Sequence, residues 1–359
     1  MRAAIKRGNR ILCDEIAELT PAAGQVLVRT CACGICGSDL HALQFPQAVT
    51  RIYELSGVDH PLHADADVVF GHEFAAEILD FGPATERKLR PGSLVTSVPR
   101  LIDQGQAHVV GYSNVFPGGY AERMLLSEQL LLPVPNGLSA VEAALTEPFS
   151  VGEHAVAASR LDGAGAALVI GCGPVGLAVI AALKARGFGP VIAADFAPGR
   201  RALAEQLGAD RVVDPADESP HRSWREFGVP QTRAERMRLL AAGTHPPNPV
   251  VFECVGVPGV LQSIVEAAPA TSQIIVVGVC MQTDRFEPAI AIAKELDLRF
   301  VLGYSGEEFA RTLSNIAEGR INAGLIVTRV VGLSEVAGAF AALATPGDQA
   351  KIVIDPSRS

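Results

Sequence analysis

The feature that most constrains this chain is an uncharged stretch from residue 163 to residue 183, GAGAALVIGCGPVGLAVIAAL. Its 21 residues reach the length that a membrane span requires. However, the run GCGPVG, from Gly171 to Gly176, lies in its middle, where a continuous helix would have to break. We therefore interpret the stretch as a buried strand, a glycine turn and a buried helix, and we expect no membrane span.

The glycine turn fits the pattern G-x-G-x-x-G. Between a strand and a helix, such glycines allow a tight turn and let a pyrophosphate approach the N–H groups at the helix N-terminus. An acidic residue ends the next predicted strand 19 residues after the last glycine, where a carboxylate would bind the ribose hydroxyls of adenosine. The predicted dinucleotide-binding residues are Gly171, Gly173, Pro174, Val175, Gly176 and Asp195.

Asp195 also bears on the choice of cofactor, because a carboxylate repels a 2′-phosphate and favours NAD over NADP. Arg200 contacts either the ribose or adenine, or only solvent on a helix face. Val255, just after a later strand of the same predicted sheet, and Val277 and Val279, at the end of another, complete the expected cofactor residues. The alternative for the glycines is close helix-strand packing in another kind of α/β protein.

Strands and helices alternate downstream of the turn, and strands such as residues 273–279, QIIVVGV, are continuously apolar. Strands of this kind are covered on both faces, as in a parallel sheet flanked by helices. We expect a doubly wound α/β domain over residues 151–297. Short strands with Gly and Pro turns predict a partly β-barrel domain over residues 1–150, which residues 298–359 rejoin.

Charge and cysteine content exclude several classes of function. The net charge of −9 argues against a nucleic-acid or anionic-membrane surface, since both require a basic face. Seven cysteines, an odd number in a chain of 359 residues, argue against a disulfide framework. The first 19 residues carry seven charged side chains and contain no apolar run of signal-sequence length. We expect a cytoplasmic protein.

A thiol, a hydroxyl, a carboxylate and an imidazole occur within six residues, from Cys36 to His41, and Gly71-His72-Glu73 follows. Widely spaced ligands from separate loops suit an open catalytic zinc site better than a closed structural one. Spacing alone leaves other interpretations open: a buried apolar cysteine, a Cys33-x-x-Cys36 redox pair, or structural histidines.

Six motifs, in this order along the chain, resemble those of the zinc-dependent medium-chain alcohol dehydrogenase family: CACGICGSDLH at 31–41, GHE at 71–73, PGGYAE at 117–122, EPFSVGEHA at 147–155, GCGPVG at 171–176 and VVGV at 276–279. The resemblance covers essentially the whole chain. It implies a Rossmann NAD-binding domain and a split GroES-like catalytic domain, with substrate held in the cleft between them.

The resemblance also implies roles for individual residues. Cys36 and His72 are implied zinc ligands. Either Glu73 or Glu147 is implied as a further ligand, and the sequence leaves that choice open. Asp39 resembles the family's carboxylate that orients the histidine ring, although it could also be an ordinary turn cap.

Ser38 and His41 match the family's proton relay, although His41 could instead be a solvated surface imidazole. The implied reaction is reversible oxidation of an alcohol to an aldehyde or ketone, so the expected partner is a small alcohol or carbonyl compound. Alternatives are a zinc-free quinone or enoyl reductase and a non-catalytic NAD-binding protein.

The chain departs from the best-known family members in residues 96–117, which contain no cysteine where those members hold a second, structural zinc. We therefore expect one zinc per chain, as in the sorbitol dehydrogenase type. We also expect a homodimer or homotetramer.

Overall fold

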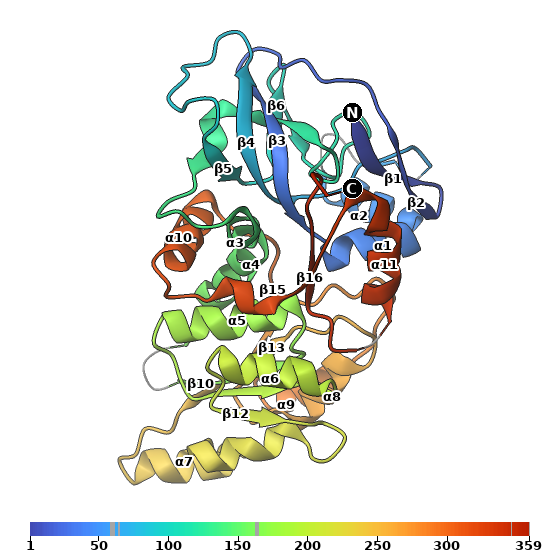
Figure 1. The fold of residues 1–359 in the computed structure, drawn as a ribbon. Coiled ribbons are helices and arrows are strands. Elements are labelled where there is room, and N and C mark those ends of the chain that lie inside the picture. Colours follow the sequence, from blue (N-terminus) through green and yellow to red (C-terminus); the bar gives the residue numbers. More distant parts are fainter. Residues whose placement is uncertain (58–61, 64, 162–164, 346, 359) are drawn as a thin grey trace. The chain divides into compact units, whose positions relative to one another are not determined.

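A computed structural model describes residues 1–57, 62–63, 65–161, 165–345 and 347–358 (Figure 1). The chain forms two compact units. Unit 1 comprises Met1–Glu147, Phe309–Gly319 and Ala323–Ser359, and unit 2 comprises Pro148–Glu308 and Arg320–Asn322. The return to unit 1 therefore comes at Phe309 and not at the expected residue 298, because the strand β15 (Asp297–Phe300) still belongs to the sheet of unit 2.

Unit 2 contains a six-stranded sheet in which every pair of neighbours is parallel. Its strands are β10 (Gly165–Ile170), β11 (Val191–Ala194), β12 (Arg211–Val213), β13 (Asn248–Glu253), β14 (Gln273–Val276) and β15 (Asp297–Phe300). The spatial order β12-β11-β10-β13-β14-β15 reverses direction at β10, as in doubly wound dinucleotide-binding folds. The expected fold class is confirmed.

Helices connect these strands: α4 (Thr146–Ala157), α5 (Pro174–Ala185), α6 (Pro198–Gln206), α7 (Arg233–Ala241), α8 (Val260–Ala267) and α9 (Pro288–Ala293), with the 3-10 segment η2 (Pro220–Phe227). Proline at the first turn of α5, α6 and α9 fits a position where no backbone N–H is needed. The uncharged stretch thus divides into β10, a turn and α5. In the described part of the chain, no helix is long and apolar enough to cross a membrane.

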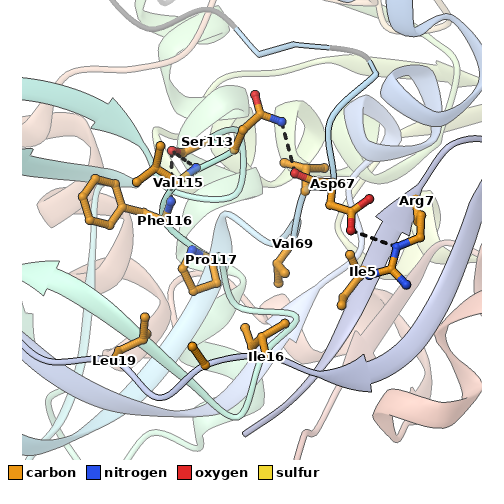
Figure 2. Close-up of a pocket in the computed structure, with 13 residues that line it drawn as sticks. Ile5, Arg7, Ile16, Leu19, Asp67, Val69, Ser113, Val115, Phe116 and Pro117 are labelled. Atoms are coloured by element: carbon orange, nitrogen blue, oxygen red, sulfur yellow. Dashed lines mark hydrogen bonds and ion pairs between the residues drawn. The ribbon is translucent and has the colours of Figure 1, made fainter.

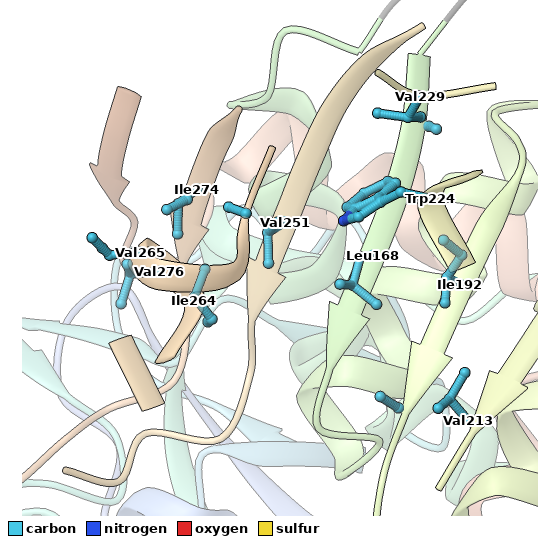
Figure 3. Packing of buried hydrophobic residues seen from close by; sticks show 13 residues of the cluster. Leu168, Ile192, Val213, Trp224, Val229, Val251, Ile264, Val265, Ile274 and Val276 are labelled. Atoms are coloured by element: carbon cyan, nitrogen blue, oxygen red, sulfur yellow. The ribbon is translucent and has the colours of Figure 1, made fainter. Parts of the chain in front are cut away.

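The single tryptophan anchors the polar segment between β12 and β13. Figure 3 shows Trp224 beside Leu168 and Ile192, two residues of the parallel sheet. The Trp224 side chain is fully buried, and its indole N–H donates to Nδ1 of His221 at 3.2 Å. Burial of an aromatic ring of this size holds the charged segment against the sheet.

Unit 1 is built on a sheet in which β3 is central. Its strands are β3 (Gln25–Gly34), β4 (Glu73–Phe81), β5 (Leu94–Ser97), β8 (Arg123–Ser127), β9 (Leu131–Pro133), β16 (Val327–Val331) and β17 (Lys351–Ile354). They follow the order β16-β17-β3-β4-β5-β9, with β8 also paired to β3. Two hairpins flank it: β1 (Arg2–Arg7) with β2 (Arg10–Glu15), and β6 (Arg100–Asp103) with β7 (Gln106–Val109).

The helices of unit 1 are α1 (Gly37–Gln44), α2 (Pro46–Leu55), α3 (Ala140–Ala144), α10 (Gly306–Ala317) and α11 (Val336–Ala344), with 3-10 turns η1 (Glu128–Leu130), η3 (Ala323–Ile326) and η4 (Leu333–Glu335). Alanines of α3 pack with Ala32, Ala75 and Val353, which come from three neighbouring strands. A strand that enters the sheet near the end of the chain, β17, lies directly beside β3. This placement is important for the site described next.

Candidate metal centre and cofactor turn

Cys36, His72 and Glu73 meet at one end of the β3–β4 pair in unit 1. Cys36 is the N-cap residue of α1, and His72 immediately precedes β4. Gly34 and Glu73 are opposite each other in the antiparallel register, which brings two motifs separated in the sequence together. The ligand atoms of the three residues all lie within 4.8 Å of one another. A thiolate, an imidazole and a carboxylate form a donor set that suits zinc.

Glu73 is fully buried and is paired with Lys351 of β17, which is also buried. The Lys351 ammonium donates to both carboxylate oxygens of Glu73 at 2.7 Å and to the carbonyl of Ile35 at 3.0 Å. The pair needs the space at Gly34, because a Cβ there would lie 1.9 Å from a Glu73 oxygen. Burial acts to lower the pKa of Lys351, but Glu73, Cys36 and Glu147 together outweigh it and raise that pKa, so the ammonium stays charged.

The centre favours positive charge. Burial alone would lower the pKa of His72, but the negative charges of Asp39, Cys36 and Glu147 outweigh it and raise that pKa well above its ordinary value. An environment that stabilises a protonated imidazole in this position also stabilises a bound cation. Glu147 is largely buried at the start of α4. Its negative charge raises the pKa values of His72 and Lys351, but its carboxylate is not part of the cluster of three possible metal ligands.

Asp39 lies behind His72. One carboxylate oxygen is 3.5 Å from Nδ1 of His72, which leaves Nε2 of the ring for another partner. Three donors reach the same carboxylate: the Cys36 N–H at 3.1 Å, the Tyr112 hydroxyl at 2.9 Å and the Tyr120 hydroxyl at 2.7 Å. The structure thus places Asp39 both in the capping position and next to the histidine, so the two interpretations of this residue are compatible.

Ser38 and His41 are both on α1 and are both half-buried. The Ser38 Oγ lies 2.7 Å from the Tyr112 hydroxyl. The Nδ1 atom of His41 is buried and has no hydrogen-bond partner among the described residues. Burial lowers the pKa of His41, so the ring is neutral at pH 7 and can accept a proton.

In unit 2, the three glycines of the turn differ in what surrounds them. Gly171 has φ of +91°, a conformation that other residues rarely adopt. A Cβ at Gly173 would meet nothing within 4 Å, so the backbone is open to a ligand. A Cβ at Gly176 would lie 1.8 Å from the Gly171 carbonyl oxygen, so α5 packs closely against the turn. Tight turn, open approach and close packing are what a bound pyrophosphate requires.

Asp195 follows β11 and lies against this turn. Its Oδ2 accepts the Cys172 N–H at 2.7 Å, and its Oδ1 accepts the Ala197 N–H at 2.8 Å. Each oxygen keeps acceptor capacity for a ribose hydroxyl. Arg201 donates to the carbonyl oxygens of Asp195 and Phe196, so it supports the backbone here. Arg200 lies on the same helix, α6, and is half-buried.

The three predicted valines differ in exposure. Val255 and Val279 are 40% and 48% exposed, whereas Val277 is 7% exposed. The side chain of Val255 lies against the turn, since its Cγ2 would be 2.7 Å from a Cβ at Gly171. Val255 is therefore next to the glycine turn, while Val277 is mainly part of the protein interior.

Sequence reasoning did not identify Lys351, Tyr112 or Tyr120 as parts of the metal centre. Tyr120 lies within the PGGYAE motif, which offered a signal. Tyr112 lies in the segment 96–117, where no motif marks it. Lys351 begins a short apolar strand, KIVI, and a lysine at such a position reads as an exposed strand end.

Two family models match the chain. One, described as an alcohol dehydrogenase GroES-like domain, matches residues 22–136, and one described as a zinc-binding dehydrogenase matches residues 174–318. Among curated relatives, the (R,R)-butanediol dehydrogenase of Bacillus subtilis (strain 168) is 32% identical over 355 residues, covering 96% of each chain. The sorbitol dehydrogenase of the same organism is 26% identical over 348 residues, covering 93% of this chain and 91% of the relative.

A solved structure, that of 2R,3R-butanediol dehydrogenase from Bacillus subtilis, has a similar fold, with a TM-score of 0.81, 30% identity and 99% of both chains covered. These similarities extend over both units and agree with the Cys36, His72 and Glu73 cluster and with the glycine turn. The chain belongs to the zinc-dependent medium-chain alcohol dehydrogenase family.

Proposed function

We propose that this NAD- and zinc-dependent dehydrogenase oxidises a secondary hydroxyl of a small diol or polyol to a ketone, reversibly. The observation that carries the proposal is the convergence of Cys36, His72 and Glu73 on one point. The substrate class rests on the similarity to a butanediol dehydrogenase and a sorbitol dehydrogenase. A zinc-free reductase would have no use for this buried donor set.

Cys36, His72 and Glu73 hold the zinc, because these are the groups whose ligand atoms lie close together. Lys351 fixes the orientation of Glu73 and balances its charge, and each carboxylate oxygen retains a lone pair for the metal. Asp39 orients His72 through Nδ1. Glu147 contributes negative charge at longer range and is not a direct ligand in this arrangement.

When bound, zinc polarises the alcohol oxygen and NAD accepts the hydride. The chain itself must receive the proton that the alcohol loses. Ser38, two positions after the ligand Cys36, accepts this proton at Oγ and releases a proton in turn, because a serine hydroxyl does not hold two. His41, a neutral imidazole one turn further along α1, takes up the released proton and passes it towards solvent.

The function is tested by monitoring NADH absorbance with a panel of butanediol stereoisomers, sorbitol, simple secondary alcohols and primary alcohols. We expect the highest kcat/KM for a secondary alcohol that carries a neighbouring hydroxyl. Activity must fall after treatment with a zinc chelator and return when zinc is added. Turnover of none of these alcohols, or full turnover without zinc, would contradict the proposal.

Asp195 sets the preference for NAD over NADP, because its carboxylate lies at the glycine turn and would repel a 2′-phosphate. Replacing Asp195 with alanine should lower kcat/KM with NAD by about tenfold and narrow its advantage over NADP, as expected for a lost charge-assisted hydrogen bond. Steady-state kinetics with both cofactors measure this. Asp210→Ala is the control, since Asp210 pairs with Lys184 outside the turn. An unchanged NAD-to-NADP ratio in Asp195→Ala would show that Asp195 does not face the ribose.

The oligomer proposed here is a homodimer in which the β15 strands of two chains pair. β15 is the last strand of the parallel sheet, and its exposed edge ends in apolar side chains: Phe300 is 68% exposed and Leu302 is 87% exposed. An open apolar edge of this kind is a template for pairing with another strand.

The charge balance and the seven unpaired cysteines of the described chain fit a cytoplasmic location.

Replacing both Phe300 and Leu302 with lysine should convert the dimer to a monomer, because two like charges would face each other across the twofold axis. Light scattering coupled to size-exclusion chromatography measures the mass. The matched control is Leu55→Lys, which changes a side chain that is 76% exposed on α2 of unit 1. A dimer that survives the double substitution would place the interface elsewhere.

A further inference from the structure

Tyr112 connects two residues of the metal centre that are adjacent in the sequence. Its hydroxyl lies 2.7 Å from the Oγ of Ser38 and 2.9 Å from Oδ1 of Asp39. The Tyr112 ring also packs on the His72 ring, with 5.1 Å between centroids. One phenol therefore contacts the proposed proton acceptor and the carboxylate behind a proposed metal ligand.

The number of available protons determines the direction of these hydrogen bonds. A phenol carries one proton, and an ionised carboxylate can only accept. The ordinary pKa of a phenol is about 10, so at pH 7 the hydroxyl of Tyr112 has this proton to donate. That proton goes to Asp39, and the Ser38 hydroxyl then donates its own proton to the Tyr112 oxygen.

We propose that Tyr112 is a positioning residue for proton transfer: by accepting the Ser38 hydrogen bond, it turns the lone pairs of Ser38 Oγ towards the alcohol proton. This inference rests on the proposed function, because it gives Ser38 its role there. Ser38 has one proton and a hydroxyl that rotates freely. Without an acceptor at a fixed position, the hydroxyl would spend time with its proton, and not its lone pairs, facing the substrate.

Tyr112 is held rigidly enough for such a role. Its ring also packs against Phe70 and Tyr53, with centroids 5.8 Å and 6.1 Å away. The following loop is fixed by its own hydrogen bonds: Figure 2 shows the Ser113 hydroxyl accepting the N–H groups of Val115 and Phe116, each at 3.1 Å. Beyond this loop lies a cavity of about 240 Å³, and its lining contains none of the proposed zinc ligands or relay residues.

Tyr120 provides an internal comparison. Its hydroxyl donates to the other oxygen of Asp39 at 2.7 Å, and its side chain is fully buried. Among the described residues, the Tyr120 hydroxyl bonds Asp39 alone, whereas the Tyr112 hydroxyl also bonds Ser38. Tyr112→Phe and Tyr120→Phe each remove one donor from the same carboxylate, and the variants differ in the loss of the bond to Ser38.

The kinetic test is a pair of double-mutant cycles with Ser38→Ala. We expect Tyr112→Phe to lower kcat for alcohol oxidation about tenfold with little change in KM, and Ser38→Ala to lower it about 100-fold. Because Tyr112 acts through Ser38, the double variant should be no slower than Ser38→Ala alone, whereas Tyr120→Phe should add its own effect. Multiplicative effects for Tyr112 and Ser38, about 1000-fold together, would overturn the proposal.

A second measurement does not depend on turnover. The chain has four tyrosines, so ¹³C labelling of the phenolic carbon gives a simple NMR spectrum in which Tyr112→Phe and Tyr120→Phe identify two resonances. Ser38→Ala should shift the Tyr112 resonance and leave the Tyr120 resonance in place. A Tyr112 resonance that does not move would overturn the proposal even if the enzyme oxidises none of the alcohols tested. Conversely, a shift without any turnover would support the positioning of Ser38 while contradicting the proposed substrate class.

Discussion

Replacing Cys36 with alanine should reduce turnover by roughly 10³-fold or more, because a catalytic zinc supplies several kcal/mol of charge stabilisation. The wild-type protein should contain one zinc per chain, and the variant should lose most of it. Removing the thiolate leaves two ligands, His72 and Glu73, which is fewer than the three protein ligands of known catalytic sites. Elemental analysis and steady-state kinetics on the same preparations measure both effects.

Cys31→Ser is the matched control, since this thiol lies in β3 and contacts the carbonyl oxygen of Arg29. It should retain zinc. If Cys36→Ala keeps its zinc and its activity, the metal centre is not where we place it. If the wild-type protein holds two tightly bound zincs per chain, a second site exists that segment 96–117 does not supply.

Replacing Lys351 with methionine should destabilise the folded protein by about 3–5 kcal/mol, because it leaves the Glu73 carboxylate buried without its partner. Methionine has a similar length, so the loss arises mainly from the unpaired charge and less from a cavity. Guanidinium unfolding of chelator-treated protein measures the change without a contribution from metal binding.

Two further variants test whether the unpaired charge of Glu73 causes this loss of stability. Lys184→Met removes a partly exposed pair with Asp210 and should cost no more than about 1 kcal/mol. Adding Glu73→Gln to Lys351→Met replaces the unpaired carboxylate with a neutral amide and should recover about half of the loss or more. No recovery in the double variant would mean that the shape of the lysine side chain matters more than its charge.

The cofactor turn could be predicted from the sequence because all its determinants are local. The strand, the three glycines and the following helix are consecutive, and each glycine has a steric reason that any bound pyrophosphate would impose. By contrast, the predicted strand 273–279 ends at Val276, because the N–H groups of Val277 and Gly278 donate to the carbonyl oxygen of Glu253.

The metal centre could be predicted only in part, because its members meet through strand pairing between distant segments. Cys36 and His72 can be predicted because they are metal-ligating residue types within the motifs CACGICGSDLH and GHE. Lys351 gave no such signal, because its partner is 278 residues away and a lysine usually lies at the surface. Tyr112 likewise lies 73 residues from Asp39, and nothing in the local sequence indicates that pairing. The pairing register of β3 with β4 and β17 brings these distant segments together, and local sequence patterns do not specify that register.

The position of β17 also determines the order in which the two units can be completed during synthesis. Every strand of the parallel sheet lies between residues 165 and 300, so unit 2 has its full set of strands before β16 and β17 leave the ribosome. The sheet of unit 1 needs β17 between β16 and β3, and Glu73 needs the ammonium that this strand carries. A nascent chain therefore has its proposed zinc-binding side chains long before it has the ammonium that pairs with the buried Glu73. The metal centre of this enzyme is thus a late product of translation, although all three of its proposed ligands are encoded near the start of the message.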